Sequence, residues 1–466
     1  MAGELYGDYS KIPMVGARVR SLFAQQGRVV LDSDVNAQTA LVLRQLRSML
    51  GDLIGPAGGP SGALGFGITV DNADGLVVTA NPAAGGLPGR YYVDGILCQI
   101  DEATSYFDQP DAFLDEDDTD DQLPDLPFLV YLKVWERTIT AIEDPSSREV
   151  ALGPNGPDTT TRNQVVWQLL AAPDVFDGVN DLGSLDADTV RARWVTWANA
   201  RDADRATLRA RASRPSGSDD EPCPTPPSAA YRGLENQLYR VEIHTVDTDP
   251  AGNVTASFKW SRDNGSATYS IESLAGELAT LATLGRDRGL MLDVGDWVEV
   301  IDDRYMLYPG HGPLGRTTSP LVRVMDVEPL DRTVRLSAAP EGVGQVQARH
   351  PFLRRWDQQP RAGGSKVVEP GNGVEVQFGG AEGDTWLELE DGIQVAFQPG
   401  NLRVGDYWLI PARTETGDVE WPGDAANPEA LPPMGVDYAF APLAVVRAAN
   451  DVLDVRMEFD PLAKPV

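Results

Sequence analysis

The strongest constraint on the fold is that short runs of β-branched and aromatic residues are closed by Gly, Pro, Asn or Asp. Between residues 66 and 100, the runs FGITVDN, GLVVTANP and GRYYVDGILCQID follow one another in this way. The chain contains 46 glycines and 35 prolines in 466 residues. Such frequent turn residues suit short strands better than long helices, so the pattern predicts a mainly β protein.

Two hairpins are predicted with particular clarity. Asp94-Gly95 lies between the runs RYYV and ILCQI, and both residue types tolerate positive φ in a two-residue turn. The run NQLYRVEIHTVDT at 236–248 is followed by the turn residues 249–253 and by VTASFKWSRDN at 254–264. We therefore expect an antiparallel strand pair at each place.

Further strands are predicted over 127–142 and 160–171, and from about residue 285 short strands alternate with turns. This later spacing is typical of small β-barrels or sandwiches. LDVGDWVEVI at 292–301 resembles LRVGDYWLIP at 402–411, with a Gly-Asp step before each strand. The similarity indicates either two related β elements or one common turn that is used twice.

Two segments are predicted to be helical. In 35–54, apolar residues recur at steps of three and four, namely Leu43, Leu46, Leu50 and Leu53, with Met49 and Ile54. Residues 185–212 are rich in Ala and Arg, with apolar residues between them. The chain is thus expected to be a β-rich α+β protein with an N-terminal strand–helix unit and one central helical excursion.

The organisation expected from these elements has three parts. Residues 1–60 form an N-terminal arm and helix, 61–284 a central β-rich body, and 285–466 small C-terminal β modules. Insertion loops are expected near 101–125 and 212–230. The acidic run at 115–121 is interpreted as a solvated loop, because it lacks the turn glycine and ligand spacing of a calcium site.

The bulk composition excludes some classes of partner. A net charge of −31 argues against nucleic-acid binding, which needs a basic surface, and against docking on anionic lipid. Cys98 and Cys223 lie in contexts that do not suggest a disulfide framework. The N-terminal sequence MAGELYGDYSKIP lacks the features of a signal peptide, and no apolar run could span a membrane. We expect synthesis in the cytoplasm and no membrane insertion.

The stretch QQGRVVLDSDVNAQ at 25–38 carries Asp32, Asp34 and Asn36 at the spacing that opens a calcium loop. That loop also needs a glycine at its sixth position and a carboxylate at its twelfth. Here those positions are Ala37 and Leu43. The sequence therefore does not predict a calcium site.

A structural joint explains the same stretch better. Asp34 is a suitable N-cap for a helix that begins at residue 35, and Asp32 adds negative charge near the positive end of the helix dipole. Gly27 permits a turn before the extended run at 28–31. The residues proposed for structural and interaction roles are Gln26, Gly27, Arg28, Asp32, Asp34 and Asn36.

No catalytic or cofactor motif is apparent. The three histidines, His244, His311 and His350, are scattered, and the sequence has no C-x-x-C, H-E-x-x-H, G-x-S-x-G or P-loop motif. We therefore predict no catalytic residue, no cofactor and no metal ligand, and we expect the protein not to be an enzyme.

Two other function classes stay open. A glycan-binding module would use exposed, coplanar indole rings, although strand tryptophans more often lie in the core. The tryptophans in or near predicted strands are Trp135, Trp167, Trp260, Trp297, Trp356, Trp386 and Trp408. A glycoside hydrolase would need a cleft with two facing carboxylates, and 70 acidic residues could supply such a pair by chance.

Several blocks together resemble an uncharacterised bacterial domain family found in gene clusters of phage-tail-like contractile injection systems. The N-terminal block is GDYSKIP followed by VRSLFAQQGRVVLDSDVNAQ. Further blocks are VWER, EDPSSREVALGPNGPDTTTR and VVWQ within 134–168, and RGLENQLYRVEIH and FKWSRDNGS within 232–266. LRRWD, LELEDGIQVAF and DYWLIPAR follow in order at 353–357, 387–397 and 406–413.

The resemblance implies a structural or assembly role in a tail-like particle, at a baseplate, fibre or cap. It implies no catalytic residue, because none is established for the family. The expected partners are other particle proteins, including further copies of the chain. Residues 8–38 are expected to act as an interaction arm. Glycan binding and glycoside hydrolysis remain the second and third alternatives.

Overall fold

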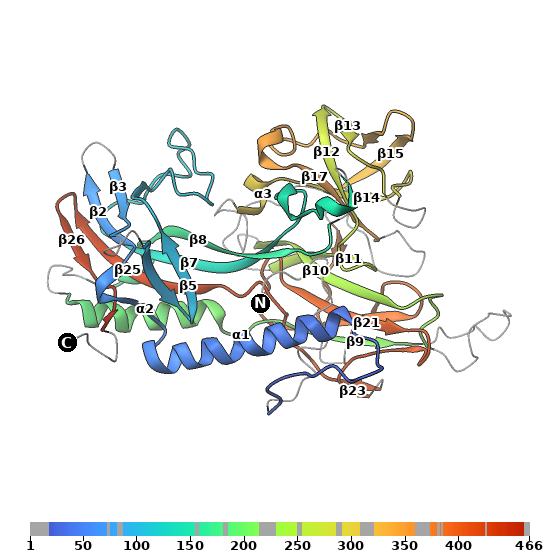
Figure 1. Cartoon of the computed structure of the whole chain (residues 1–466), viewed down its shortest axis with the longest axis horizontal. Helices are drawn as coiled ribbons and strands as arrows, with labels where there is room; N and C mark the ends of the chain where they lie inside the picture. Colours follow the sequence, from blue (N-terminus) through green and yellow to red (C-terminus); the bar gives the residue numbers. More distant parts are fainter. Residues whose placement is uncertain are drawn as a thin grey trace.

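The chain is mainly β, with three α-helices, a closed barrel and several open sheets among the described residues (Figure 1). The β-rich fold class expected from the sequence is confirmed. The computed structural model describes residues 18–71, 75–81, 87–153, 158–179, 185–213, 230–248, 254–285, 291–307, 321–358, 373–379, 383, 385–424 and 426–460.

One half of the molecule is built on a four-stranded antiparallel sheet. Its order is β26 (Asp451–Asp454), β25 (Ala439–Ala448), β7 (Phe128–Ile139) and β8 (Arg162–Ala172). β7 is apolar on both faces, because Val130 and Leu132 face one core while Leu129 and Tyr131 pack with helix α2 (Ala187–Asp202). A strand with two buried faces reads as a continuous apolar run, as this one does.

Two small sheets complete this half. One consists of β27 (Glu458–Phe459), β1 (Ala57–Pro60), β4 (Gly89–Val93) and β5 (Ile96–Ile100). The other consists of β2 (Gly67–Asp71), β3 (Gly75–Thr79) and β6 (Thr104–Ser105). Asp94 and Gly95, with φ of 47° and 75°, join β4 to β5. The predicted two-residue hairpin turn is confirmed, and its positive φ values match a type I′ turn.

The other half contains a five-stranded sheet, a three-stranded sheet and one short strand pair. The first has the order β18 (Val374–Glu375), β11 (Val254–Ser261), β10 (Gln237–Thr248), β21 (Tyr407–Arg413) and β22 (Asp418–Val419). The others are β19 (Leu387–Glu388), β20 (Ile393–Gln398) and β9 (Thr207–Ala212), and β23 (Gly423–Asp424) with β24 (Asn427–Pro428). β10 and β11 pair antiparallel, as predicted. Their core includes the buried rings of Tyr239, Phe258, Phe397 and Trp408.

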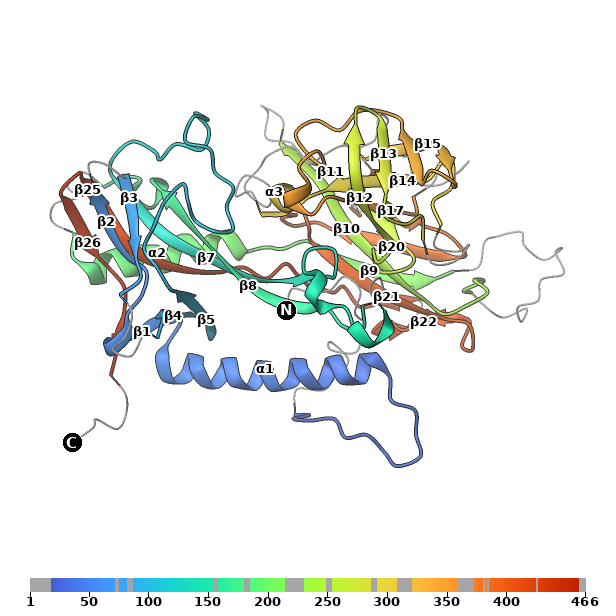
Figure 2. The ribbon, with the colours of Figure 1, turned by 45° about the horizontal axis from the view of Figure 1, so that its top comes forward.

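A closed six-stranded barrel packs on this half, on the side away from α1 (Figures 1 and 2). Its order is β12 (Thr268–Ala275), β13 (Leu278–Leu281), β16 (Thr333–Leu336), β15 (Val322–Glu328), β14 (Trp297–Ile301) and β17 (Phe352–Trp356). Short helix α3 (Asp303–Leu307) follows β14. The barrel strands come from both sides of residue 285, so the pairing crosses the boundary expected there.

The two Val-Gly-Asp sequences form the same turn. Oδ2 of Asp296 accepts a hydrogen bond from the backbone N–H of Asp293 at 2.9 Å, and Oδ2 of Asp406 accepts one from Arg403 at 2.9 Å. Gly295 and Gly405 have φ of 103° and 86° before β14 and β21. These strands lie in different sheets, so the sequence similarity reflects a common turn used twice.

The helices differ from the predictions in their limits. Helix α1 (Asp32–Ile54) begins three residues earlier than expected, and no strand forms in residues 18–31. The helix expected over 185–212 ends at Asp202, because the residues from Thr207 onward pair with β20 as β9. Most of the insertion expected near 212–230 lies outside the described residues. No helix in the described part of the chain is long and apolar enough to cross a membrane.

Candidate interaction surface

The segment before α1, residues 18–31, is here called the arm. The backbone N–H of Arg28 donates to the carbonyl of Gln25 at 3.2 Å, and Gly27 has a φ of 74°. A residue without a Cβ adopts this left-handed conformation at little cost. The turn sends the chain back toward the start of α1, and Figure 2 shows the arm as the dark blue loop that extends beyond the helix.

The arm is tied to one flank of α1 by two glutamine side chains. The backbone N–H of Leu22 donates to Oε1 of Gln38 at 2.5 Å. Seven residues further along the helix, Nε2 of Gln45 donates to the carbonyl of Arg20 at 2.8 Å. The spacing of seven residues places both glutamines on the same face of α1, so the arm runs antiparallel to the helix.

Small residues make up much of the face that α1 turns toward the rest of the protein. Its buried residues are Ser33, Ala37, Ala40 and Leu41. Near the other end, the guanidinium of Arg47 lies 2.5 Å from a carboxylate oxygen of Glu136 on β7. A Cβ at Gly95 would lie 2.8 Å from Cα of Arg47, so only glycine lets the β4–β5 turn approach the helix this closely.

The opposite face of α1 carries a row of large apolar side chains exposed to solvent. We call this row the α1 stripe; it consists of Leu31, Val35, Val42, Leu46, Met49 and Leu53. Their exposed fractions lie between 44% and 64%. Steps of four, seven, four, three and four residues keep them on one narrow face, as in the apolar seam of a coiled coil.

The arm and the α1 stripe concentrate exposed apolar surface in one short segment. Of the 22 large hydrophobic side chains that are exposed among the described residues, ten lie between Val19 and Leu53. The arm contributes Phe23, which is 86% exposed, and Val29, which is 84% exposed. Scattered exposed apolar residues need no explanation, but a contiguous group of this kind marks an interaction surface.

The charge of this segment is opposite in sign to that of the chain. Residues 18–54 contain five arginines and three aspartates, within a chain of net charge −31. Four of these arginines are exposed, namely Arg18, Arg20, Arg28 and Arg44, whereas Arg47 is paired with Glu136. The α1 stripe therefore lies within a locally positive region.

The residues singled out in the sequence fall on this surface with mixed outcomes. Gln26, Gly27, Arg28 and Asp32 are exposed, and Asp34 and Asn36 are half-buried. The N-cap prediction for Asp34 is wrong, because the helix begins at Asp32 and its N-cap is Leu31, which supplies no side-chain bond. Asp32 and Asp34 instead lie in the first turn, where negative charge interacts favourably with the helix dipole.

The α1 stripe was not anticipated from the sequence. The repeat Leu43, Leu46, Leu50, Leu53 predicts one packed face, but Leu46 and Leu53 are exposed and Leu43 and Leu50 are half-buried. The available signal was the group of small residues at 33, 37 and 40, whose spacing marks a second face suited to close packing. Apolar residues on a face other than that one should then be accessible.

The tryptophans do not form a sugar-binding surface. Of the seven in or near predicted strands, six are at most 8% exposed, and Trp386 is half-buried beneath the guanidinium of Arg211. Nε1 of Trp356 donates to Glu299 and Nε1 of Trp408 donates to the carbonyl of Leu431. Their rings are core groups with satisfied polar atoms, so they offer no coplanar platform to a glycan.

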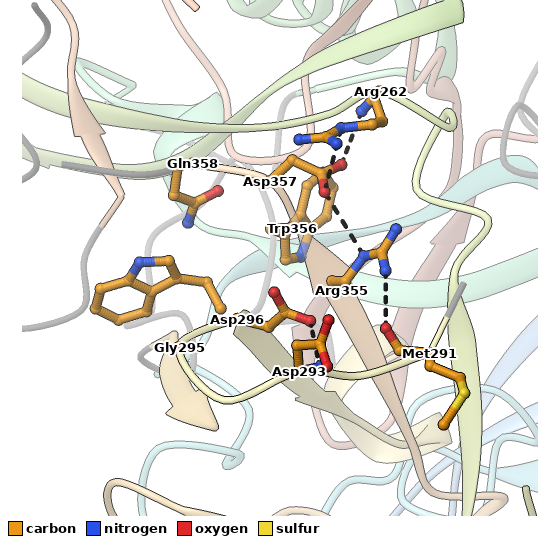
Figure 3. Close-up of a pocket in the computed structure, with 10 residues that line it drawn as sticks. Arg262, Met291, Asp293, Gly295, Asp296, Arg355, Trp356, Asp357 and Gln358 are labelled. Carbon is orange, nitrogen blue, oxygen red and sulfur yellow. Dashed lines mark hydrogen bonds and ion pairs between the residues drawn. The ribbon is translucent and has the colours of Figure 1, made fainter. Parts of the chain in front are cut away.

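A small polar pocket of about 160 Å³ lies at one rim of the barrel (Figure 3). A carboxylate oxygen of Asp357 is 3.6 Å from Nε of both Arg262 and Arg355. Asp296, whose pKa is raised by burial, is bonded to the backbone of Asp293. Because these charged groups are committed to one another, the geometry does not present the acid and nucleophile of a glycosidase.

The acidic run is organised by its own side chains. The carboxylate of Asp121, which is 4% exposed, accepts a hydrogen bond from the backbone N–H of Asp115 at 2.8 Å. Carboxylates of Asp115 and Asp118 accept bonds from residues two positions later. Among the described residues, no group of three or more His, Cys, Asp or Glu side chains is arranged to hold a metal ion.

Comparison with known proteins gives one match. The model of a family described as a family of unknown function, DUF6519, matches residues 6–191 and 177–464. No curated protein and no solved structure matches the chain. The matched ranges together cover almost the whole sequence.

Proposed function

The chain belongs to the DUF6519 family of unknown function, and we propose that it is a non-enzymatic structural or assembly component of a phage-tail-like contractile injection particle. The observation that carries the proposal is the α1 stripe, with the arm beside it. The particle context rests on the sequence resemblance, and the position would be at a baseplate, fibre or cap.

The α1 stripe is large enough to support a specific contact. Full burial of a Val, Leu or Met side chain contributes about 1.5–3 kcal/mol. The six stripe residues are about half exposed, so covering them would contribute on the order of 5–9 kcal/mol. Association costs several kcal/mol in lost freedom, so the arm must add to the contact for binding to be tight.

The partners expected under this proposal are other particle proteins, including further copies of the chain, after synthesis in the cytoplasm. A nucleic-acid partner does not fit the overall charge of −31. The glycan-binding and glycosidase alternatives gain no support, because the indole rings are buried and the pocket carboxylates are held in ion pairs and backbone bonds.

The test is incorporation into purified particles. The double variant Val42→Asp/Met49→Asp places two charges in the α1 stripe, and both positions are about half exposed, so folding should be retained. Val195→Asp is a matched control, because Val195 lies on α2 and is 51% exposed, as is Val42. Mass spectrometry should find the control at wild-type level and the double variant reduced at least about tenfold. Normal incorporation of the double variant would contradict the proposal.

A further inference from the structure

The barrel carries a second exposed apolar surface, which we call the barrel face. It lies on β13, β15, β16 and their turns, and β16 is the central neighbour of β13 and β15. Leu278 and Asp326 both pair with Arg335 of β16. The exposed apolar residues are Leu278, Met325 and Leu330, and the exposed carboxylates are those of Glu277, Asp326, Glu328 and Asp331.

The barrel face and the arm–α1 surface have opposite charge. Across the described barrel residues 268–356, seven exposed carboxylates face solvent against three exposed guanidinium groups. Arg332 is one of these three, and it is paired with Glu272 at 3.2 Å. The arm and α1 instead expose four arginines and two aspartates. Each surface therefore combines apolar residues with a charge that attracts the other.

The two surfaces cannot meet within one molecule. In both views of the ribbon, the barrel and α1 lie on opposite sides, with the sheet of β10, β11 and β21 between them (Figures 1 and 2). A contact between them therefore needs two molecules. After it forms, each molecule still has one unused surface of each kind.

We propose that copies of this chain associate head to tail, with the arm and α1 stripe of one copy seated on the barrel face of the next. This inference rests on the proposed assembly role and names one partner for the α1 stripe, a second copy of the chain. A two-fold contact between two α1 helices would instead bring two positive segments together. Head-to-tail contacts generate rings or filaments rather than closed dimers.

Two complementary variants separate head-to-tail from two-fold association. The first is Val42→Asp/Met49→Asp in the α1 stripe, and the second is Glu328→Lys/Asp331→Lys on the barrel face. The control is Glu116→Lys/Asp117→Lys, which makes the same charge change at exposed positions of the acidic loop. Mass is measured for the full chain by analytical ultracentrifugation over a concentration series.

The wild type and control should form species larger than one chain, and each double variant alone should be monomeric. An equimolar mixture of the two double variants should form a two-chain species and nothing larger, because only one intact interface remains. If the barrel variant still dimerises alone, or the mixture stays monomeric while the wild type associates, the head-to-tail arrangement is wrong.

The assembly role can stand if this inference fails. A wild-type chain that remains monomeric up to about 100 µM overturns self-association. If Val42→Asp/Met49→Asp nevertheless blocks incorporation into particles, the α1 stripe binds a different protein and the proposed function survives. If the variant also incorporates normally, both claims fall.

Discussion

At the scale of single residues, Lys133 is the clearest departure from ordinary core packing. It lies on β7, is 3% exposed, and its Nζ is 4.2 Å from the ring centre of Tyr438 and 5.1 Å from that of Trp135. It has no ion pair with a carboxylate of the described residues. Burial, reinforced by the charge of Arg403, lowers the pKa of Lys133 to about 7.

Lys133→Met should therefore stabilise the protein near pH 7. The unfolded lysine titrates near 10.5, so between about pH 7 and 10.5 the unfolded state binds more protons and stability rises with pH. The cost of burying this lysine is largest below that window. At 1.4 kcal/mol per pKa unit, it is at most about 4 kcal/mol. Urea unfolding at pH 7 and pH 10 should show a gain that shrinks at the higher pH; an equal gain at both would contradict this account.

A second buried group, Lys259, links two structural units. Its ammonium lies 2.7 Å from Glu299 on barrel strand β14 and 3.3 Å from Glu242 on β10. Burial alone would raise the pKa of Glu242, but Arg240, Lys259 and Arg354 outweigh it and lower the value to about 2. The contribution of Glu242 to stability is thus present above about pH 4.5 and is lost as the pH falls toward 2.

Lys259→Met should destabilise the protein by about 3–5 kcal/mol, because it leaves buried carboxylates without their cation. Adding Glu299→Gln to this variant should restore part of the loss, since it removes one of those charges. Chemical denaturation at pH 7 measures both effects. Equal stability of the single and double variants would show that Lys259 and Glu299 are not coupled.

At the scale of elements, two glycines of the N-terminal segment make opposite predictions. Gly27→Ala places a Cβ at a φ of 74° and should weaken the arm turn by about 1 kcal/mol. Gly51→Ala lies inside α1, where a Cβ meets nothing within 4 Å, and should stabilise the helix by about 1 kcal/mol. Hydrogen exchange at Arg28 should accelerate in the first variant, and exchange near the end of α1 should slow in the second. The same direction of change in both would contradict the assignment.

Local patterns predicted individual elements well. The Asp94-Gly95 turn, the β10–β11 pair and the body of α1 depend on neighbouring residues, so the sequence contains their determinants. The end of the helix predicted over 185–212 failed because β9 gains its partner from β20, almost 200 residues away. Such tertiary pairing outweighs the small differences in intrinsic helix propensity.

The orientation of α1 could be predicted only in part. A period of three to four residues identifies the helix, but apolar residues on more than one face leave open which of them packs. Small residues at 33, 37 and 40 decided the outcome by allowing close approach. The prediction of an interaction role for residues 8–38 stays a prediction, and residues 8–17 lie outside the described part of the chain.

At the scale of the whole molecule, pairing between distant segments determines the architecture. β25 pairs with β7 although about 300 residues separate them, and β27 pairs with β1 across almost 400 residues. The boundary expected at residue 285 was placed by a change in sequence texture, which carries no information about strand partners. The interleaved pairing presents the barrel face and the α1 stripe on opposite sides of one molecule (Figure 2).

The central claim is that the α1 stripe is covered by another protein chain in the assembled particle. Oxidative footprinting of Met49, which is 52% exposed, tests this claim without any mutation, because thioether oxidation follows accessibility. In the dilute, isolated chain Met49 should oxidise readily, and in the particle its rate should fall at least about fivefold relative to added free methionine. An unchanged rate for Met49 in particles that contain the chain would contradict the account.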